Sequence, residues 1–132
     1  MQPGQFRKLV LEGGGRDRGR AHGEALRELI AEHFDRWLTA IAADFRVDPA
    51  SYIRKFLFDT DFLPAIERWT PDLLEEVRGI AEASNQDFDL VLARQLSDEE
   101  PWYRREFKRA LPSHAGCTSL GVSAHGELAT IV

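Results

Sequence analysis

Hydrophobic residues recur every three or four positions from about Arg20 to Phe45. This spacing places side chains on one face of an α-helix, and the charged residues fall mostly between them. The pattern predicts one long amphipathic helix. Its apolar stripe comprises Leu26, Ile30, Phe34, Trp37, Leu38, Ile41 and Phe45. Before it, residues 5–13 favour a short strand, and the glycine-rich residues 13–20 favour a flexible turn.

Helix-start signals mark four shorter segments further along the chain. Asp48 followed by Pro49 predicts a second helix, because an Asp accepts from free N–H groups and Pro fits the first helical position. Pro64 falls in the first turn of a third segment, and Thr70-Pro71-Asp72 begins a fourth. A last helix is predicted from about Phe88 to Leu96, and residues 101–116 are polar and proline-bounded, as in an exposed linker.

The character of the sequence changes near its end. Residues 117–122 and 127–132 are short β-like runs, joined by a turn that contains Gly126. The pattern predicts an α+β fold, in which a mostly helical region (1–116) leads into the first strands of a sheet (117–132). Because a lone hairpin is only marginally stable in water, we expect that sheet to be incomplete in this chain.

Composition narrows the functional classes. The formal net charge of −5 argues against nucleic acid and anionic membrane as partners, because both attract basic patches. One cysteine cannot form an internal disulfide, and no apolar stretch is long enough for a signal peptide or a membrane span. The expected location is the cytoplasm.

Neither a phosphate loop nor a metal centre is predicted. The glycine-rich stretch lacks both the Lys-Ser/Thr ending of a P-loop and the Gly-x-Gly-x-x-Gly spacing. His114 and Cys117 stand three apart with His125 further on, which is too few ligands for a structural zinc site. His22 and His33 are expected far away on the long helix, nearly on opposite faces.

Asp98, Glu99 and Glu100 form an acidic cluster after the last predicted helix. Negative charge at a helix C-terminus is mildly unfavourable with the helix dipole. The cluster is therefore either a solvated helix end or the partner of a basic group, for which Arg104 and Arg105 are the candidates.

Gly116-Cys117 is the remaining candidate for chemistry. A lone cysteine is most often a small buried hydrophobe. After a glycine and before a strand, however, its thiol can attack the carbonyl carbon of the preceding, unhindered peptide bond. Hydrolysis of the resulting thioester would leave Cys117 as a new N-terminal residue. Its α-amine, with a pKa of about 7.7–8.0, could then act as the base for its own thiol.

Three stretches together carry a family resemblance. They are residues 18–30, with Gly19, His22, Gly23 and Glu24; residues 73–99, with a Glu-x-x-Gly-Ile-Ala-Glu pattern and an Asp-Glu ending; and residues 116–122, Gly-Cys-Thr-Ser-Leu-Gly-Val. In order and spacing, the chain resembles the N-terminal part of the acyl-coenzyme A:isopenicillin N acyltransferase family. These are cysteine N-terminal-nucleophile hydrolases that cut their own chain.

The resemblance implies an αββα sandwich and self-cleavage between Gly116 and Cys117. Cys117 would be the nucleophile, Thr118 and Ser119 possible supporting residues, and an acyl group would pass to an amine or to water. No cofactor is implied, although acyl-coenzyme A is a candidate substrate. Because the family's oxyanion-stabilising residues lie beyond Val132, a further implied partner is the remainder of the catalytic chain or a second subunit. Residues 1–132 alone are therefore expected to be inactive.

Two other functions stay open from the residues alone. The chain could be a noncatalytic helical interaction domain whose strands pair with a partner chain, since β-like sequence at an unpaired edge invites pairing. It could also be a stand-alone thiol hydrolase in which His114 or His125 serves as the base for Cys117.

Overall fold

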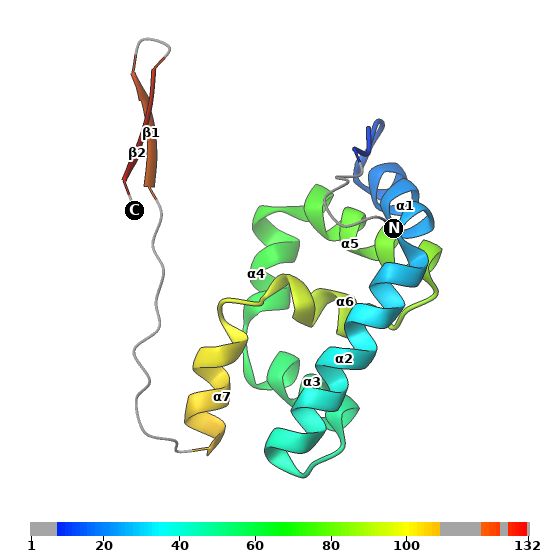
Figure 1. Cartoon of the computed structure of the whole chain (residues 1–132), viewed down its shortest axis with the longest axis vertical. Helices are drawn as coiled ribbons and strands as arrows, with labels where there is room; N and C mark the ends of the chain where they lie inside the picture. The colour runs from blue at the N-terminus through cyan, green and yellow to red at the C-terminus, as the bar shows by residue number, and fades with distance from the viewer. Residues whose placement is uncertain (1–7, 109–119, 125–126, 132) are drawn as a thin grey trace, which may run out of the picture.

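The computed structural model describes residues 8–108, 120–124 and 127–131. Helices account for 79% of residues 8–108, and that range contains no strand. Figure 1 shows the arrangement of the helices, which pack against one another. Their bounds are α1 (Gly15–Ala25), α2 (Arg27–Phe45), α3 (Pro49–Asp59), α4 (Phe62–Trp69), α5 (Pro71–Ser84), α6 (Phe88–Gln95) and α7 (Glu100–Lys108).

The predicted α+β fold with an αββα sandwich is wrong for this structure. The helices bury their apolar faces on one another, so they form no layer of a helix-and-sheet sandwich. The other residues that the structure describes form two antiparallel strands, β1 (Leu120–Ala124) and β2 (Glu127–Ile131), with Val122 opposite Ala129. Within the described ranges these strands pair only with each other.

The N-terminal helix differs from its prediction at both ends. The expected single helix from Arg20 to Phe45 is divided at Leu26, whose backbone (φ −120°, ψ 17°) is not helical. The expected glycine turn is confirmed only at Gly13, which has a positive φ of 90°, and Gly14; it is wrong from Gly15 on, where the helix begins. The expected strand at 5–13 is absent from residues 8–12, and its first three residues lie outside the described ranges.

Close packing against α5 explains why glycines occupy a helix. Gly15, Gly19 and Gly23 are buried on α1 and face α5, which contributes the buried Gly79. A Cβ atom built on Gly19 would lie 2.0 Å from the carbonyl oxygen of Glu76, and one on Gly79 would lie 2.4 Å from that of Arg16. The two backbones therefore approach so closely that no side chain fits between them.

Ion pairs run along both sides of this contact. Arg16 donates to Glu75 and Glu82, and Arg18 donates to Asp72 and Glu76 at 2.8 and 2.9 Å. Hydrogen bonds from Arg18 and from the backbone N–H of Gly15 hold the pKa of Asp72 below its usual value. Arg16, Arg18 and Glu76 are half-buried and the other carboxylates are exposed, so these pairs remain partly in water and set the register of the two helices more than they stabilise them.

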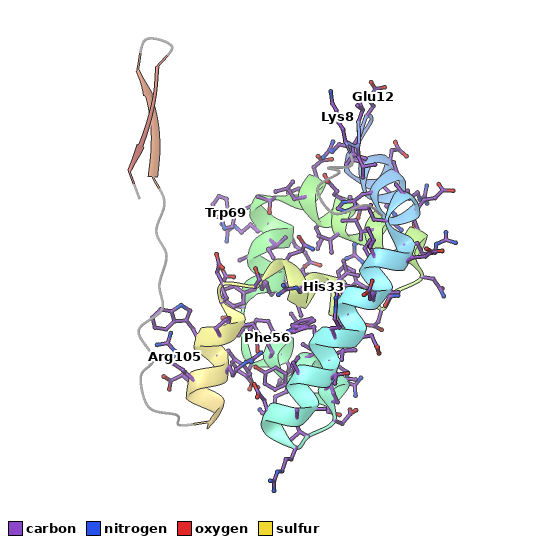
Figure 2. All side chains as sticks on the ribbon, in the orientation of Figure 1. Lys8, Glu12, His33, Phe56, Trp69 and Arg105 are labelled. Carbon is purple, nitrogen blue, oxygen red and sulfur yellow. The ribbon has the colours of Figure 1, made fainter. Side chains whose placement is uncertain are left out.

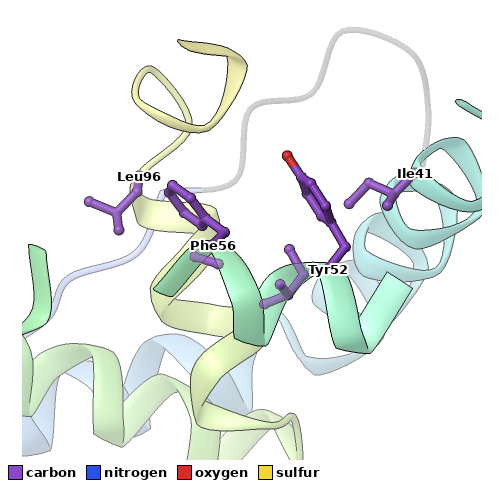
Figure 3. Close-up of a cluster of buried hydrophobic side chains, with 6 residues drawn as sticks. Ile41, Tyr52, Phe56 and Leu96 are labelled. Carbon is purple, nitrogen blue, oxygen red and sulfur yellow. The ribbon is translucent and has the colours of Figure 1, made fainter. Parts of the chain in front are cut away.

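The hydrophobic core has two parts that meet at α6. Phe34, Ile80, Ala81 and Val91 join α2, α5 and α6. The second cluster, part of which is shown in Figure 3, joins α2, α3 and α6 and comprises Ile41, Tyr52, Ile53, Phe56, Ala93 and Leu96. Phe56, labelled also in Figure 2, is fully buried.

The helix-start predictions mostly hold. Asp48 accepts from the backbone N–H of Ser51 at 2.8 Å and begins α3, and Asp87 accepts from the first turn of α6. Thr70 makes no side-chain cap, although α5 does begin at Pro71.

The linker predicted for residues 101–116 is wrong over its first half. These residues belong to α7, and Tyr103 packs on the core with its ring centroid 5.1 Å from that of Phe56. Within the described ranges no helix has both the length and the apolar character needed to cross a bilayer.

Replacing Gly19 with alanine should destabilise the protein. The new Cβ meets backbone atoms of α5 that cannot rotate away, so the helices must separate; overpacking of this kind costs about 2 kcal/mol. Urea unfolding of the full chain measures the free energy of unfolding. Gly14→Ala is the matched control, because no described atom lies within 4 Å of a Cβ there, and its cost should stay below about 1 kcal/mol. Equal midpoints for the two variants would contradict the close contact.

Candidate functional site

The residues predicted to carry catalysis lie outside the described residues. This holds for Gly116, Cys117, Thr118 and Ser119, and also for His114 and His125. The cleavage site, the nucleophile and its supporting hydroxyls therefore stay predictions. Two polar clusters within residues 8–108 do have a defined geometry.

The first cluster surrounds Glu100. Its side chain is buried, with 4% of the residue exposed, and both carboxylate oxygens accept hydrogen bonds. Tyr52 Oη donates to Oε1 at 2.5 Å, while Arg104 donates from Nε to Oε1 and from Nη2 to Oε2, each at 3.0 Å. The prediction that the acidic cluster has Arg104 as a basic partner is confirmed for Glu100.

The position of Glu100 also changes the electrostatic argument. It stands in the first turn of α7 and not at the end of the preceding helix, so the helix dipole favours its charge. Arg104 Nη1 also donates a hydrogen bond of 3.2 Å to Oδ2 of Asp44, which lies on α2. Burial, and then the hydrogen bond to Glu100, raise the pKa of Tyr52, which keeps its hydroxyl protonated and able to donate. The cluster thus ties α2, α3 and α7 together, and Glu100 is engaged at both oxygens.

The second cluster joins α2 to α6. Arg94 Nε donates to His33 Nε2 at 2.7 Å, and the Arg94 guanidinium lies 5.3 Å from the centre of the Trp37 ring. Burial, together with the nearby charges of Arg94 and Arg36, lowers the pKa of His33. His33 is therefore neutral at pH 7, which leaves Nε2 free to accept from Arg94.

A surface groove of about 200 Å³ borders this cluster. His33 belongs to α2, and Figure 2 shows its side chain on the helical body. The groove is lined mainly by apolar side chains, with polar groups at its edge; its lining is Leu26, Leu29, Ile30, Phe34, Ile80, Val91, His22, His33, Arg94 and Gln95.

His22 and His33 therefore border one groove, and their expected placement on opposite faces is wrong. Eleven positions are about three turns at ~3.6 residues per turn, so the spacing already returns to the same side. Sequence reasoning missed the groove because its other wall comes from α5 and α6. In the part of the chain that the structure describes, no group of three or more His, Cys, Asp or Glu side chains could hold a metal ion.

Comparison with known proteins adds no relative to this picture. No protein-family model matches the chain, and neither a curated protein nor a solved structure shows significant similarity to it.

Replacing Glu100 with glutamine should destabilise the protein strongly. The change leaves the half-buried Arg104 without its two-oxygen acceptor, and breaking a buried pair from one side costs about 3 kcal/mol. Thermal and urea unfolding measure the loss. Asp98→Asn is the control, since Asp98 is an exposed member of the same acidic cluster and should change stability by less than about 0.5 kcal/mol. A Glu100→Gln variant as stable as this control would show that the Glu100–Arg104 ion pair does not stabilise the protein.

The stability of the protein should fall as the pH drops below about 6.5, the ordinary pKa of histidine. The folded state holds His33 neutral, so in this window the unfolded chain binds more protons and acidification favours unfolding. Carboxylates with lowered pKa values, such as Asp72, lose their contribution only below about pH 4.

Urea titrations between pH 7.5 and 5 measure this dependence. His33→Gln keeps a carbonyl oxygen that can accept from Arg94 but has no titrating ring. Its stability should therefore vary less with pH over the same window. A variant with the same pH slope as the wild type would assign the dependence to another group.

Proposed function

We propose that the chain is the N-terminal part of an autoprocessing thiol acyltransferase or amidohydrolase. The observation that carries the proposal is the dipeptide Gly116-Cys117, which holds the chain's only cysteine. The Cys117 thiol attacks the Gly116 carbonyl carbon, the C–N bond breaks as a C–S bond forms, and the nitrogen takes up the thiol proton and becomes a free amine. Water then hydrolyses the thioester, which releases Gly116 as a carboxylate.

The same thiol carries the second reaction. After cleavage, the Cys117 α-amine takes the thiol proton, and the thiolate attacks the carbonyl of an acyl donor, for which acyl-coenzyme A is a candidate. The leaving group departs protonated. An amine or water then takes the acyl group and restores the thiol. Thr118 and Ser119 would help to orient the cysteine.

Two features support this proposal. The stretches that carry the family resemblance include Gly19, Gly23 and Gly79, and these are the residues at which α1 and α5 meet. A lone cysteine also suits the cytoplasm, where a thiol stays reduced, and the proposal places the protein there.

Mass spectrometry of the full-length protein, with the remainder of the catalytic chain that the resemblance implies, tests the cleavage. The wild type should divide into residues 1–116 and a second fragment, and N-terminal sequencing of that fragment should find Cys117 first. Cys117→Ala should remain a single chain, because alanine has no nucleophile.

The double variant His114→Ala, His125→Ala separates this proposal from a thiol hydrolase that uses a histidine base. It should keep the wild-type turnover of an acyl-thioester probe, since the Cys117 α-amine that cleavage exposes, and not an imidazole, serves as the base in acyl transfer. If the wild type stays uncut, and matches Cys117→Ala in mass and in turnover of an acyl-thioester probe, the proposal is wrong.

A second candidate function is a noncatalytic helical interaction domain that pairs its strands with a partner chain. The favouring observation is the two-stranded ladder, in which β1 and β2 each keep one edge unpaired among the described residues. An open edge offers backbone donors and acceptors to a further strand. An uncut chain that is monomeric alone and captures no partner would contradict this candidate.

A further inference from the structure

Arg94 is a half-buried cation, and none of the described carboxylates pairs with it. Other half-buried arginines, such as Arg16, Arg18 and Arg104, each pair with carboxylates. Arg94 instead contacts a neutral imidazole and an indole ring. Taking a guanidinium partly out of water is costly unless an anion or a polar group compensates. The site therefore holds an uncompensated positive charge within residues 8–108.

The two contacts fix the orientation of the guanidinium. His33 occupies its Nε atom, and Trp37 lies against it as a cation–π partner. No hydrogen bond from the described residues reaches Nη1 or Nη2. These two nitrogens form the forked donor pair that matches the two oxygens of a carboxylate.

The groove beside Arg94 is mainly apolar. One wall of the groove comes from α2 and the residue before it, with Leu26, Ile30 and Phe34. The other wall has Ile80 of α5 and Val91 of α6. Within the described ranges no acidic side chain lines it, and its polar groups are His22, His33, Arg94 and Gln95. The groove thus combines one oriented cation, Arg94, with a short apolar lining.

We propose that this groove binds a small monocarboxylate with an apolar tail. The carboxylate pairs with Arg94, and the tail lies over the apolar side chains of α2, α5 and α6. The inference rests on the groove's own geometry, so it stands or falls independently of the proposed acyl transfer.

Charge and size exclude other small ligands. A cation would meet Arg94 without a carboxylate to balance it. A phosphate dianion needs more than one cation, and Arg36, the other cation whose charge acts on His33, already pairs with Glu32 at 3.4 Å. A groove of about 200 Å³ is below the usual ~300–1,000 Å³ of drug-sized sites, so the ligand is small. Octanoate has the required headgroup and a tail of suitable length.

Isothermal titration calorimetry of the full chain with octanoate tests the proposal. Saturable one-to-one binding is expected for the wild type. Arg94→Gln should weaken the affinity at least about tenfold, because it removes a charge-assisted, two-pronged contact. Arg68→Gln is the matched control: Arg68 also lies over a tryptophan, Trp69, but away from the groove, and its loss should leave the affinity unchanged.

Two further arms keep the result interpretable. Octanol carries the same tail without the charge and should bind at least about tenfold more weakly than octanoate. Leu29→Glu places a negative charge at an exposed edge of the groove, where it does not disturb the core, and should weaken octanoate binding while the far-ultraviolet circular dichroism stays that of the wild type.

The proposal fails if octanoate gives no saturable binding at millimolar concentration. It also fails if octanol binds as tightly as octanoate, or if both folded variants, Arg94→Gln and Leu29→Glu, keep the wild-type affinity. These results say nothing about cleavage before Cys117, which mass spectrometry measures separately. Cys117→Ala should bind octanoate as the wild type does.

Discussion

The direct contact of two helix backbones sets the geometry of this protein. α1 and α5 approach until a Cβ atom at Gly19 would overlap the carbonyl oxygen of Glu76. Glycine in a helix costs about 1 kcal/mol relative to alanine, so four buried glycines at one contact are favourable only because of what the approach allows. It brings Arg16 and Arg18 onto the acidic face of α5, and it holds α2, which continues from α1, over the core formed with α5 and α6.

The two polar clusters of the helical body differ in whether their charges are paired. Around Glu100 every charge is matched, because Tyr52 and Arg104 together satisfy both oxygens of one buried carboxylate. Around Arg94 the charge is left open, since a neutral His33 orients the guanidinium without neutralising it. A matched buried cluster stabilises a fold and has no free group for a ligand, whereas an oriented and uncompensated cation beside an apolar groove is suited to an anionic one.

The groove and the proposed nucleophile concern different parts of the chain. The groove belongs to the helical body, where packing fixes each side chain. Cys117 lies in the segment between that body and the strands, and its chemistry is argued from the residue itself and its glycine neighbour. Each can therefore be tested without the other. If both proposals hold, one protein combines a carboxylate site in its helical body with a cysteine that makes and breaks acyl bonds.

The sequence by itself determined those features that depend on neighbours along the chain. The helix starts at Pro49, at Pro71 and after Asp87 follow from local capping and proline geometry, and the apolar stripe of α2 follows from its period. Only the tertiary structure decided why glycines occupy α1, why residues 101–108 form a helix, and which carboxylate takes Arg104. These depend on atoms that are distant in sequence: the backbone of Glu76 excludes a side chain at Gly19, and Phe56 and Tyr52 hold Tyr103 and Glu100 in place. Periodicity and capping carry no information about such contacts, because the same local pattern occurs whichever surface packs against it.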